Sequence, residues 1–310
     1  MACRLRRGLH LALLAALLGG RAATADDPGL ALRERYRVEV DHRLELPPEA
    51  QARYALSLRA ALDQAGYPDL RSQYLLLVDR DPQVQAALLW WLSELGEPAL
   101  IGASPVSTGK PGEYEHFLTP TGVFRHSPAN FDHRSEGTEN KLGILGYGEQ
   151  GLRVYDFGWQ LATRGWGAGG VSPMRLVMHA TDPRYLEPRL GTAQSKGCVR
   201  IPTTLDRFLD RYGLLDADYL TEAVPDKLRW LLRPDREPTP WPGRLMVVID
   251  SGLAERPAWS PAPPKTKGGG AEGPATAAAA ADRHPACTDT TGRLAPAGEP
   301  GQCKPLATTP

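Results

Sequence analysis

The feature that most constrains the fold is a series of short apolar runs separated by turn-forming residues. Between residues 73 and 251, Asp, Gly and Pro interrupt every apolar run before it reaches the length of a typical core helix. Short runs rich in branched and aromatic side chains favour buried β-strands. The sequence therefore predicts a mainly β fold, a curved sheet or sandwich, with strands within 74–78, 84–92, 99–107, 122–126, 152–157, 174–179 and 245–249.

The first two runs flank the turn Asp79-Arg80-Asp81-Pro82, which predicts a β-hairpin. Successive side chains of a strand point to opposite faces, so Trp90 and Trp91 should face opposite sides of that hairpin.

Helical patterns are few and lie at the edges of this region. Residues 26–72 are expected to form an N-terminal packing extension, with a β-like stretch at 36–40 and an amphipathic helix over 49–64 that stops at Gly66. A second helix is expected after 200, begun by a side-chain cap from Thr203 or Thr204 and ended by Gly213. Its shared apolar face would hold Leu205, Phe208, Leu209 and Tyr212.

The first 25 residues are typical of a secretory signal. Basic residues precede an apolar run over 9–18, and small residues follow at 23–25. We predict a signal peptide over 1–25 and an exported protein of the periplasm or cell wall. The apolar run is too short for a permanent membrane span. Cleavage there removes four arginines and no acid from the 36 basic and 36 acidic residues, giving a net charge of −4. This balance argues against nucleic acid or an anionic membrane surface as a partner.

The C-terminal residues 252–310 are dominated by Pro, Ala, Gly, Thr and Ser. Such a composition buries too little apolar surface to offset chain entropy, so we expect this tail to be disordered. Cys287 and Cys303 lie within it and could form a disulfide after export, although their spacing does not decide this.

The strongest chemical signal is Cys198, in the sequence Ser195-Lys196-Gly197-Cys198, downstream of His179. A cysteine reacts as the thiolate, so it needs a base or a positive charge nearby, which His179 and Lys196 could supply. The alternative is a small buried hydrophobe, the usual role of a free cysteine. Gly197 favours a tight turn whose N–H groups could stabilise an oxyanion, and export makes an unused free thiol a liability. We therefore predict a nucleophile.

Other chemical sites are not expected. The spacing of His116, His126 and His133 fits no zinc site, so we predict no metal, and no cofactor motif is present.

The stretch 127–170 is long for a connection and is expected to form a lid or a groove wall over the thiol. Alternatively, its aromatic side chains belong to the core; these are Tyr147, Tyr155, Trp159 and Trp166.

These residues together resemble the catalytic domain of the L,D-transpeptidases, the YkuD-like domains that remodel bacterial peptidoglycan. The family signature is a histidine, a gap of about fifteen residues, then Ser/Thr-His-Gly-Cys, a hydrophobic residue and Arg or Asn. Here His179 is followed by Ser195-Lys196-Gly197-Cys198-Val199-Arg200. The segments 107–112 and 119–124 resemble upstream family elements. The similarity covers about 73–251, and it implies the family's fold, no cofactor, and peptidoglycan stem peptides as the partner.

The sequence departs from the family pattern at two positions. Ala180 replaces the usual glycine or serine after the histidine, which is harmless if only its backbone carbonyl is used. Lys196 replaces the histidine beside the glycine and cysteine. The family assigns the role of the base to the upstream histidine, which is His179 here. Lys196 could favour the thiolate by its charge, or simply face solvent.

The resemblance implies a two-step acyl transfer. His179 would take the proton of Cys198, and the thiolate would attack the third residue of a tetrapeptide stem and expel D-alanine. An amine acceptor gives a cross-link, whereas water makes the protein an L,D-carboxypeptidase. Gly197 and Cys198 N–H groups would stabilise the oxyanion, and a carbonyl near Ala180 or Ser195 would orient the imidazole.

Two further alternatives stay open at this stage. Arg200 could meet a substrate carboxylate or form an internal salt bridge. The chain could also be an inactive wall-binding scaffold on the same fold, with Lys196 marking the loss of activity.

Overall fold

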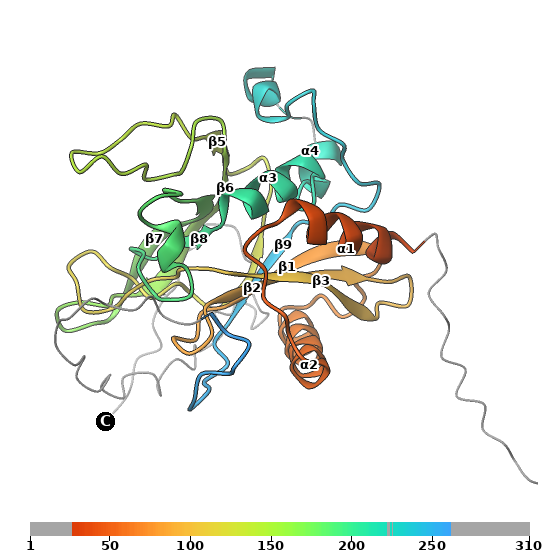
Figure 1. Cartoon of the computed structure of the whole chain (residues 1–310), viewed down its shortest axis with the longest axis horizontal. Helices are drawn as coiled ribbons and strands as arrows, with labels where there is room; N and C mark the ends of the chain where they lie inside the picture. The colour runs from red at the N-terminus through yellow and green to blue at the C-terminus, as the bar shows by residue number, and fades with distance from the viewer. Residues whose placement is uncertain (1–26, 222–223, 225, 262–310) are drawn as a thin grey trace, which may run out of the picture. The chain divides into compact units, whose positions relative to one another are not determined.

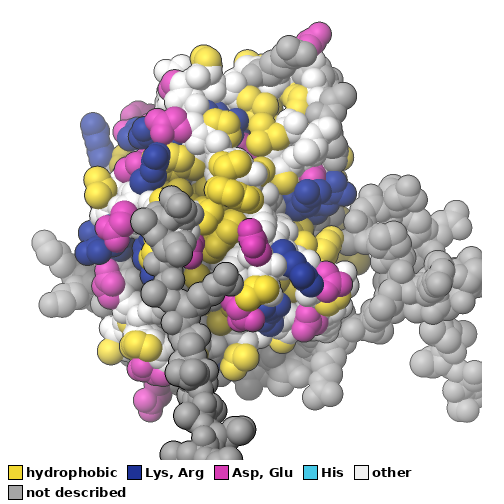
Figure 2. All heavy atoms as spheres, turned by 90° about the vertical axis from the view of Figure 1, so that its right-hand side faces the viewer, with side chains coloured by type: hydrophobic (Ala, Val, Ile, Leu, Met, Phe, Trp, Pro, Cys, Tyr) yellow, Lys and Arg dark blue, Asp and Glu magenta, His cyan; other side chains and the backbone are white. Residues whose placement is uncertain are grey.

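The computed structural model describes residues 27–221, 224 and 226–261 (Figure 1). The predicted signal peptide and residues 262–310, with Cys287 and Cys303, lie outside the described residues. None of the helices in the described part is long and apolar enough to cross a membrane. On the face seen in Figure 2, basic and acidic side chains are interspersed.

The first of two mixed sheets has the strand order β3-β2-β1-β9-β4. The predicted hairpin forms from β1 (Gln73–Asp79) and β2 (Ala86–Leu92), paired antiparallel, and β3 (Pro98–Pro105) adds to its outer edge. On the other side, β9 (Leu245–Ile249) runs parallel to β1 and antiparallel to β4 (Gly122–Arg125). A strand from near the end of the described chain therefore lies inside the sheet.

The second sheet has the order β5-β6-β7-β8. Its main hairpin is β6 (Arg153–Thr163) with β7 (Val171–Ala180), flanked by the short strands β5 (His133–Arg134) and β8 (Val199–Ile201). The predicted strands at 152–157 and 174–179 are confirmed but are longer than the apolar runs, because the hairpin continues into residues exposed to solvent.

Two hydrophobic clusters lie on opposite faces of the first sheet. One fills the space between the two sheets and includes Trp91, and the other includes Trp90 and packs under a helix. The two tryptophans thus face opposite sides, as the alternation predicts. The mainly β, two-sheet architecture predicted from the apolar runs is confirmed.

The β-like stretch predicted at 36–40 is wrong. Residues Pro28–Glu39 form the helix α1, capped by the side chain of Asp27, which accepts a hydrogen bond from the Gly29 N–H. Leu32 and Tyr36 are buried on one face of this helix, in the cluster between the sheets. Leu32 and Tyr36 are four residues apart, so they lie one above the other on the helix. Their packing in the core stabilises the helix more than the β-propensity of Tyr36 and Val38 opposes it.

The other predicted helices are confirmed. The helix α2 (Pro48–Gln64) covers the outer face of the first sheet with Ala50, Tyr54, Leu58 and Leu62 (Figure 1). The helix α3 (Thr203–Arg211) follows β8, and Gly213 after it has φ +57°. The predicted threonine cap is wrong, because Pro202 is the N-cap residue and Thr203 and Thr204 lie inside the first turn.

Three short elements complete the fold and were not predicted. They are the helix α4 (Ala217–Thr221) and the 3-10 helices η1 (Glu187–Arg189) and η2 (Asp226–Leu231).

The predicted disorder from residue 252 is wrong for residues 252–261. Trp259 packs edge-on against Tyr54, with ring centroids 5.9 Å apart. Ser260 is buried and its Oγ donates to the carbonyl oxygens of Gln83 and Val84. Arg256 donates to the carbonyl oxygens of Pro82 and Pro261. Three large or polar side chains in ten residues were enough to anchor this segment, although the average composition of the tail is that of a disordered chain.

Candidate functional site

The pairing of β7 with β8 brings His179 and the segment of Cys198 together. The two strands run parallel, with His179 beside Arg200 and Met178 beside Val199. Cys198 directly precedes β8, and its thiol lies at the backbone N–H of Val177 on the neighbouring strand. We call the residues that lie side by side across neighbouring strands a row. His179 and Cys198 are nineteen residues apart in sequence, but the sheet places them in adjacent rows on one face, two residues apart along β7.

The turn before Cys198 is held by Ser195. Its Oγ donates to the Cys198 carbonyl oxygen at 2.6 Å and accepts from the Gly197 N–H at 3.0 Å. Gly197 has φ +125°, and a Cβ there would lie 2.8 Å from the sulfur of Met174. Only glycine fits both the backbone angle and the space.

This geometry bears on the expected oxyanion donors. The Gly197 N–H donates to Ser195 Oγ within the turn, so its role as an oxyanion donor stays a prediction. The N–H of Cys198 itself lies at the thiol and favours the thiolate. The Cys198 amide is therefore the donor beside the sulfur.

The two upstream segments, 107–112 and 119–124, hold the turn before Cys198 in place. Thr119 Oγ1 donates to the Gly197 carbonyl oxygen at 2.8 Å and accepts from the Gly109 N–H at 2.9 Å. The Thr108 carbonyl oxygen accepts from the Ser195 N–H at 3.0 Å. Sequence reasoning missed the role of Thr119, since no local pattern announces a contact with residue 197.

His179 is buried, and its Nδ1 lies 2.5 Å from the Ala180 carbonyl oxygen. A carbonyl only accepts, so Nδ1 carries the proton and Nε2 is the proton-accepting nitrogen. Burial lowers the pKa of His179 to about 4, and the charge of Arg200 acts in the same direction. The imidazole is therefore a neutral base at neutral pH.

The thiol is neutral in the resting state as well. Burial raises the pKa of Cys198 above its ordinary value, while the charge of Arg200 and the Val177 N–H act in the opposite direction. The site thus holds a thiol and an imidazole, with no preformed ion pair between them. Proton transfer has to accompany the attack on a substrate.

Arg200 is the cation that acts on the sulfur. Its Nη1 donates to the Gln194 carbonyl oxygen at 3.2 Å, and its buried Nε has no hydrogen-bond partner. No carboxylate in residues 27–221, 224 and 226–261 forms an ion pair with Arg200, so the internal salt bridge left open by the sequence is not found there. Burial lowers the pKa of its guanidinium, and the charge of Cys198 raises it.

Lys196 points away from this chemistry. Its ammonium pairs with Glu115 at 3.3 Å, and both side chains are well exposed. An exposed pair of this kind is screened by water. The structure favours the solvent-facing alternative for Lys196.

The stretch 127–170 places one aromatic side chain, Tyr147, against His179. Tyr147 lies edge-on to the His179 ring, with centroids 4.6 Å apart. The charge of Cys198 contributes, after burial, to the raised pKa of Tyr147, so the phenol lies near the sulfur too. The other three aromatic side chains of the stretch have different surroundings. Tyr155 lies in the hydrophobic core, Trp166 packs on Phe117, and Trp159 is exposed to solvent.

His126 is also buried and has a structural role. Its Nδ1 lies 2.8 Å from the Leu215 carbonyl oxygen and its Nε2 lies 2.9 Å from Asp132. Arg153 bonds the same carboxylate and also pairs with Asp216. Both ring nitrogens are occupied, so His126 is not placed to act as a base.

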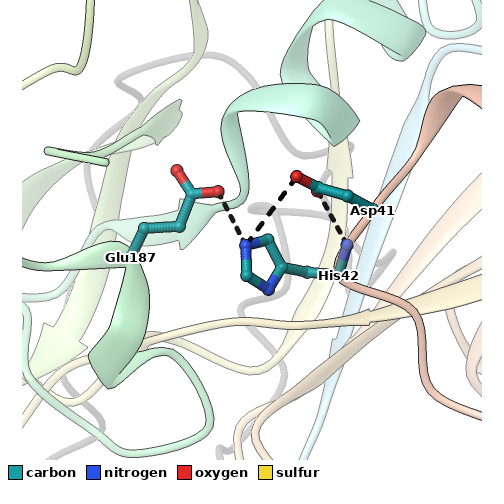
Figure 3. Close-up of side chains that lie close together, drawn as sticks. All are labelled: Asp41, His42 and Glu187. Carbon is teal, nitrogen blue, oxygen red and sulfur yellow. Dashed lines mark hydrogen bonds and ion pairs between the residues drawn. The ribbon is translucent and has the colours of Figure 1, made fainter. Parts of the chain in front are cut away.

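A group of possible metal ligands lies between the N-terminal extension and η1. His42 Nε2 is 3.2 Å from Glu187 and 4.0 Å from Asp41 (Figure 3). Asp41 and His42 are exposed, and Glu187 also accepts from the Thr203 hydroxyl. These contacts join the N-terminal extension to the segment that leads into the turn before Cys198.

A cavity of about 550 Å³ lies beside α3, apart from Cys198 and His179. Its lining includes Asp206, whose Oδ2 is buried without a hydrogen-bond partner. Burial raises the pKa of Asp206 to about 8. Arginines paired with carboxylates form much of the remaining wall.

Comparison with known proteins agrees with this geometry. No curated protein matches the chain. Residues 73–225 match the L,D-transpeptidase catalytic domain family, YkuD, from the start of β1 through the turn with Cys198 and past α3. With the two-sheet fold and the adjacent histidine and cysteine segments, this match shows that the chain belongs to the YkuD family of L,D-transpeptidase catalytic domains, whose members act on peptidoglycan.

Proposed function

We propose that this protein is an exported peptidoglycan L,D-transpeptidase that acts through an acyl-enzyme on Cys198. The observation that carries the proposal is the parallel pairing of β7 with β8, which sets Cys198 beside Val177, two residues along β7 from His179. Nδ1 of His179 is bound to the Ala180 carbonyl oxygen, and the thiol lies at Val177, one row of the sheet away. The carbonyl of Ala180 orients the base, as an acid does in other triads.

In the first step, Cys198 Sγ attacks the carbonyl carbon of the third residue of a tetrapeptide stem. The thiol proton passes to Nε2 of His179, and the oxyanion accepts from the Cys198 N–H. The C–N bond to D-alanine then breaks, and the departing nitrogen takes the proton from His179. A thioester and free D-alanine result.

In the second step, the amine of a neighbouring stem attacks the thioester carbon. His179 accepts the amine proton and returns it to the sulfur, which leaves as the thiol. The product is a cross-link between two third residues, and the enzyme is restored. Water in place of the amine gives the L,D-carboxypeptidase reaction.

Arg200 is proposed to bind a substrate carboxylate. Its partly buried guanidinium has an N–H without a protein partner, and it lies in the same row of the sheet as His179. A desolvated guanidinium of this kind binds carboxylates strongly and with defined geometry.

The experiment is incubation of the mature protein with purified disaccharide-tetrapeptide, with products identified by mass spectrometry. We expect loss of D-alanine and a cross-linked dimer. Loss of D-alanine without a dimer would identify a carboxypeptidase, and no reaction would identify an inactive scaffold.

Two substitutions tie the reaction to the site. Cys198→Ala should abolish turnover and the covalent adduct with a carbapenem while the melting temperature stays near that of the wild type. His179→Ala should slow acylation by about 10² to 10⁴-fold, the usual contribution of a positioned base. His42→Gln, an exposed histidine outside the site, is the matched control and should react at the wild-type rate.

A further inference from the structure

The face of the second sheet that carries His179 continues well past the catalytic residues. Residues paired across antiparallel strands share a face, and so do alternate residues of one strand. On β7, His179 therefore shares its face with Val177, Arg175, Pro173 and Val171. The intervening Met174, Leu176 and Met178 are in the core cluster on the opposite face.

A bulge in β6 brings Trp159 onto this face. Asp156 pairs with Val177, but the next pair is Trp159 with Arg175, so β6 has one extra residue there. Gly158 within the bulge has φ +78°, and a Cβ there would lie 2.8 Å from Asn130. After the bulge, Leu161 pairs with Pro173 and Thr163 pairs with Val171.

The result is an apolar stripe that leads away from the thiol. Its members are exposed: Trp159 is 68% exposed, Leu161 57% and Val171 49%, with Pro173 also exposed. Exposed apolar side chains gathered along one hairpin face are typical of a binding surface. The row of Val177 and Cys198 is continuous with the stripe, because Arg175 and Trp159 form the next row along the strands.

The rows give the stripe a length scale. Two residues along a strand advance by about 7 Å, so Trp159 lies roughly 7 Å from the row of the thiol and Leu161 roughly 14 Å from it. In a peptidoglycan stem, three residues and a lactyl group separate the scissile carbonyl from the sugar ring. Three extended residues span about 10 Å, so a stem laid along the hairpin brings its sugar to the rows of Trp159 and Leu161.

We propose that the apolar stripe of Trp159, Leu161, Pro173 and Val171 binds the hexosamine ring of the glycan that carries the donor stem. The apolar C–H face of a pyranose ring stacks on an indole and on aliphatic side chains, while its hydroxyl groups remain in water. This inference rests on the proposed function and adds the glycan to the recognised substrate. It makes Trp159 a positioning residue, outside the chemical step.

The test compares two substrates that differ only in the sugar: disaccharide-tetrapeptide and the free tetrapeptide. Trp159→Ala should lower kcat/KM for the disaccharide-tetrapeptide roughly tenfold, mainly through KM, and leave the free tetrapeptide unchanged. Trp159→Phe should keep most of the preference, because it keeps an aromatic face. The rate of carbapenem acylation should be that of the wild type in both variants, since the drug carries no glycan.

Trp230→Ala is the matched control, because Trp230 is also exposed, at 55%, but lies in η2. Leu161→Ser provides a second probe of the stripe and should act in the same direction as Trp159→Ala. Suppose the wild-type enzyme is active on both substrates, and Trp159→Ala and Leu161→Ser either lower kcat/KM equally for both substrates or leave it unchanged for both. That result would overturn the glycan site alone. A wild-type enzyme inactive on both substrates would overturn the proposed function and the glycan site with it.

Discussion

Tyr147 covers the imidazole of His179 edge-on, with ring centroids 4.6 Å apart. The tyrosine thus forms part of the wall that keeps water from the base. Since burial is the main cause of the low His179 pKa of about 4, the proton affinity of the base depends on its cover.

Tyr147→Ala should therefore raise the pKa of His179 toward its ordinary value of about 6.5. A base must be neutral to accept a proton, so the acid limb of the acylation rate should move to higher pH. The pH profile of carbapenem acylation measures this shift. Tyr114→Ala, which removes another exposed tyrosine, should leave the profile in place. An unmoved acid limb in Tyr147→Ala would show that the phenol does not shield the ring.

The pKa of the Cys198 thiol should depend on the charge of Arg200. Alkylation of Cys198 by iodoacetamide should be slow at neutral pH and rise only in alkaline solution, because burial raises the thiol pKa. Arg200→Gln removes the positive charge that favours the thiolate and should move the profile to still higher pH. Lys196→Gln is the control and should change nothing, because that lysine pairs with Glu115 in solvent. The reverse order of the two variants would assign the electrostatic role to Lys196.

The start of the tail should stabilise the domain. Deletion of residues 256–310 removes the contacts of Arg256, Trp259 and Ser260 and should lower the melting temperature by roughly 5–10 °C. Deletion of residues 262–310 alone should leave it within a degree or two. Thermal unfolding of the two truncated proteins side by side decides the point, and equal melting temperatures would show that the docked segment contributes nothing.

Asp206 should make stability depend on pH. Its folded-state pKa of about 8 lies above its ordinary value of about 4, so the folded state binds the proton more tightly. The resulting stabilisation is complete below pH 4 and is lost as the pH rises through 8. Asp206→Asn cannot ionise, so the free energy of unfolding should fall less for this variant than for the wild type between pH 5 and pH 9. Parallel curves from urea titrations would contradict the assignment.

The strands and the proximity of the His179 and Cys198 segments could be predicted, because both have local signals. Apolar runs mark β1, β2 and β9, and the spacing of His179 and Cys198 suggests a paired base and thiol. The helix α1 was mistaken for a strand at 36–40, because its apolar face is narrow and its packing partner is distant in sequence. Residues 252–261 were expected to be disordered, because a few side chains, among them Arg256, Trp259 and Ser260, hold them on the domain. These few residues do not show in the average composition of the tail.

The electrostatics of the site could not be predicted from spacing. Lys196 lies only two residues before Cys198 in the sequence, yet its ammonium pairs with the distant Glu115. Arg200 acts on the sulfur because the parallel pairing of β7 and β8 places it beside His179. Thr119 and Tyr147 reach the site from distant loops, and only the tertiary fold shows these contacts.

The place of β9 in the first sheet has a consequence for how the chain folds. β1 and β4 do not pair with each other, and each meets β9, which comes more than a hundred residues after β4. Until residues 245–249 have been synthesised, both strands expose open edges that invite pairing with other chains. Sheet closure is therefore a late event with a long loop to order, so folding should be slow and the nascent protein should depend on protection until its final strand is available.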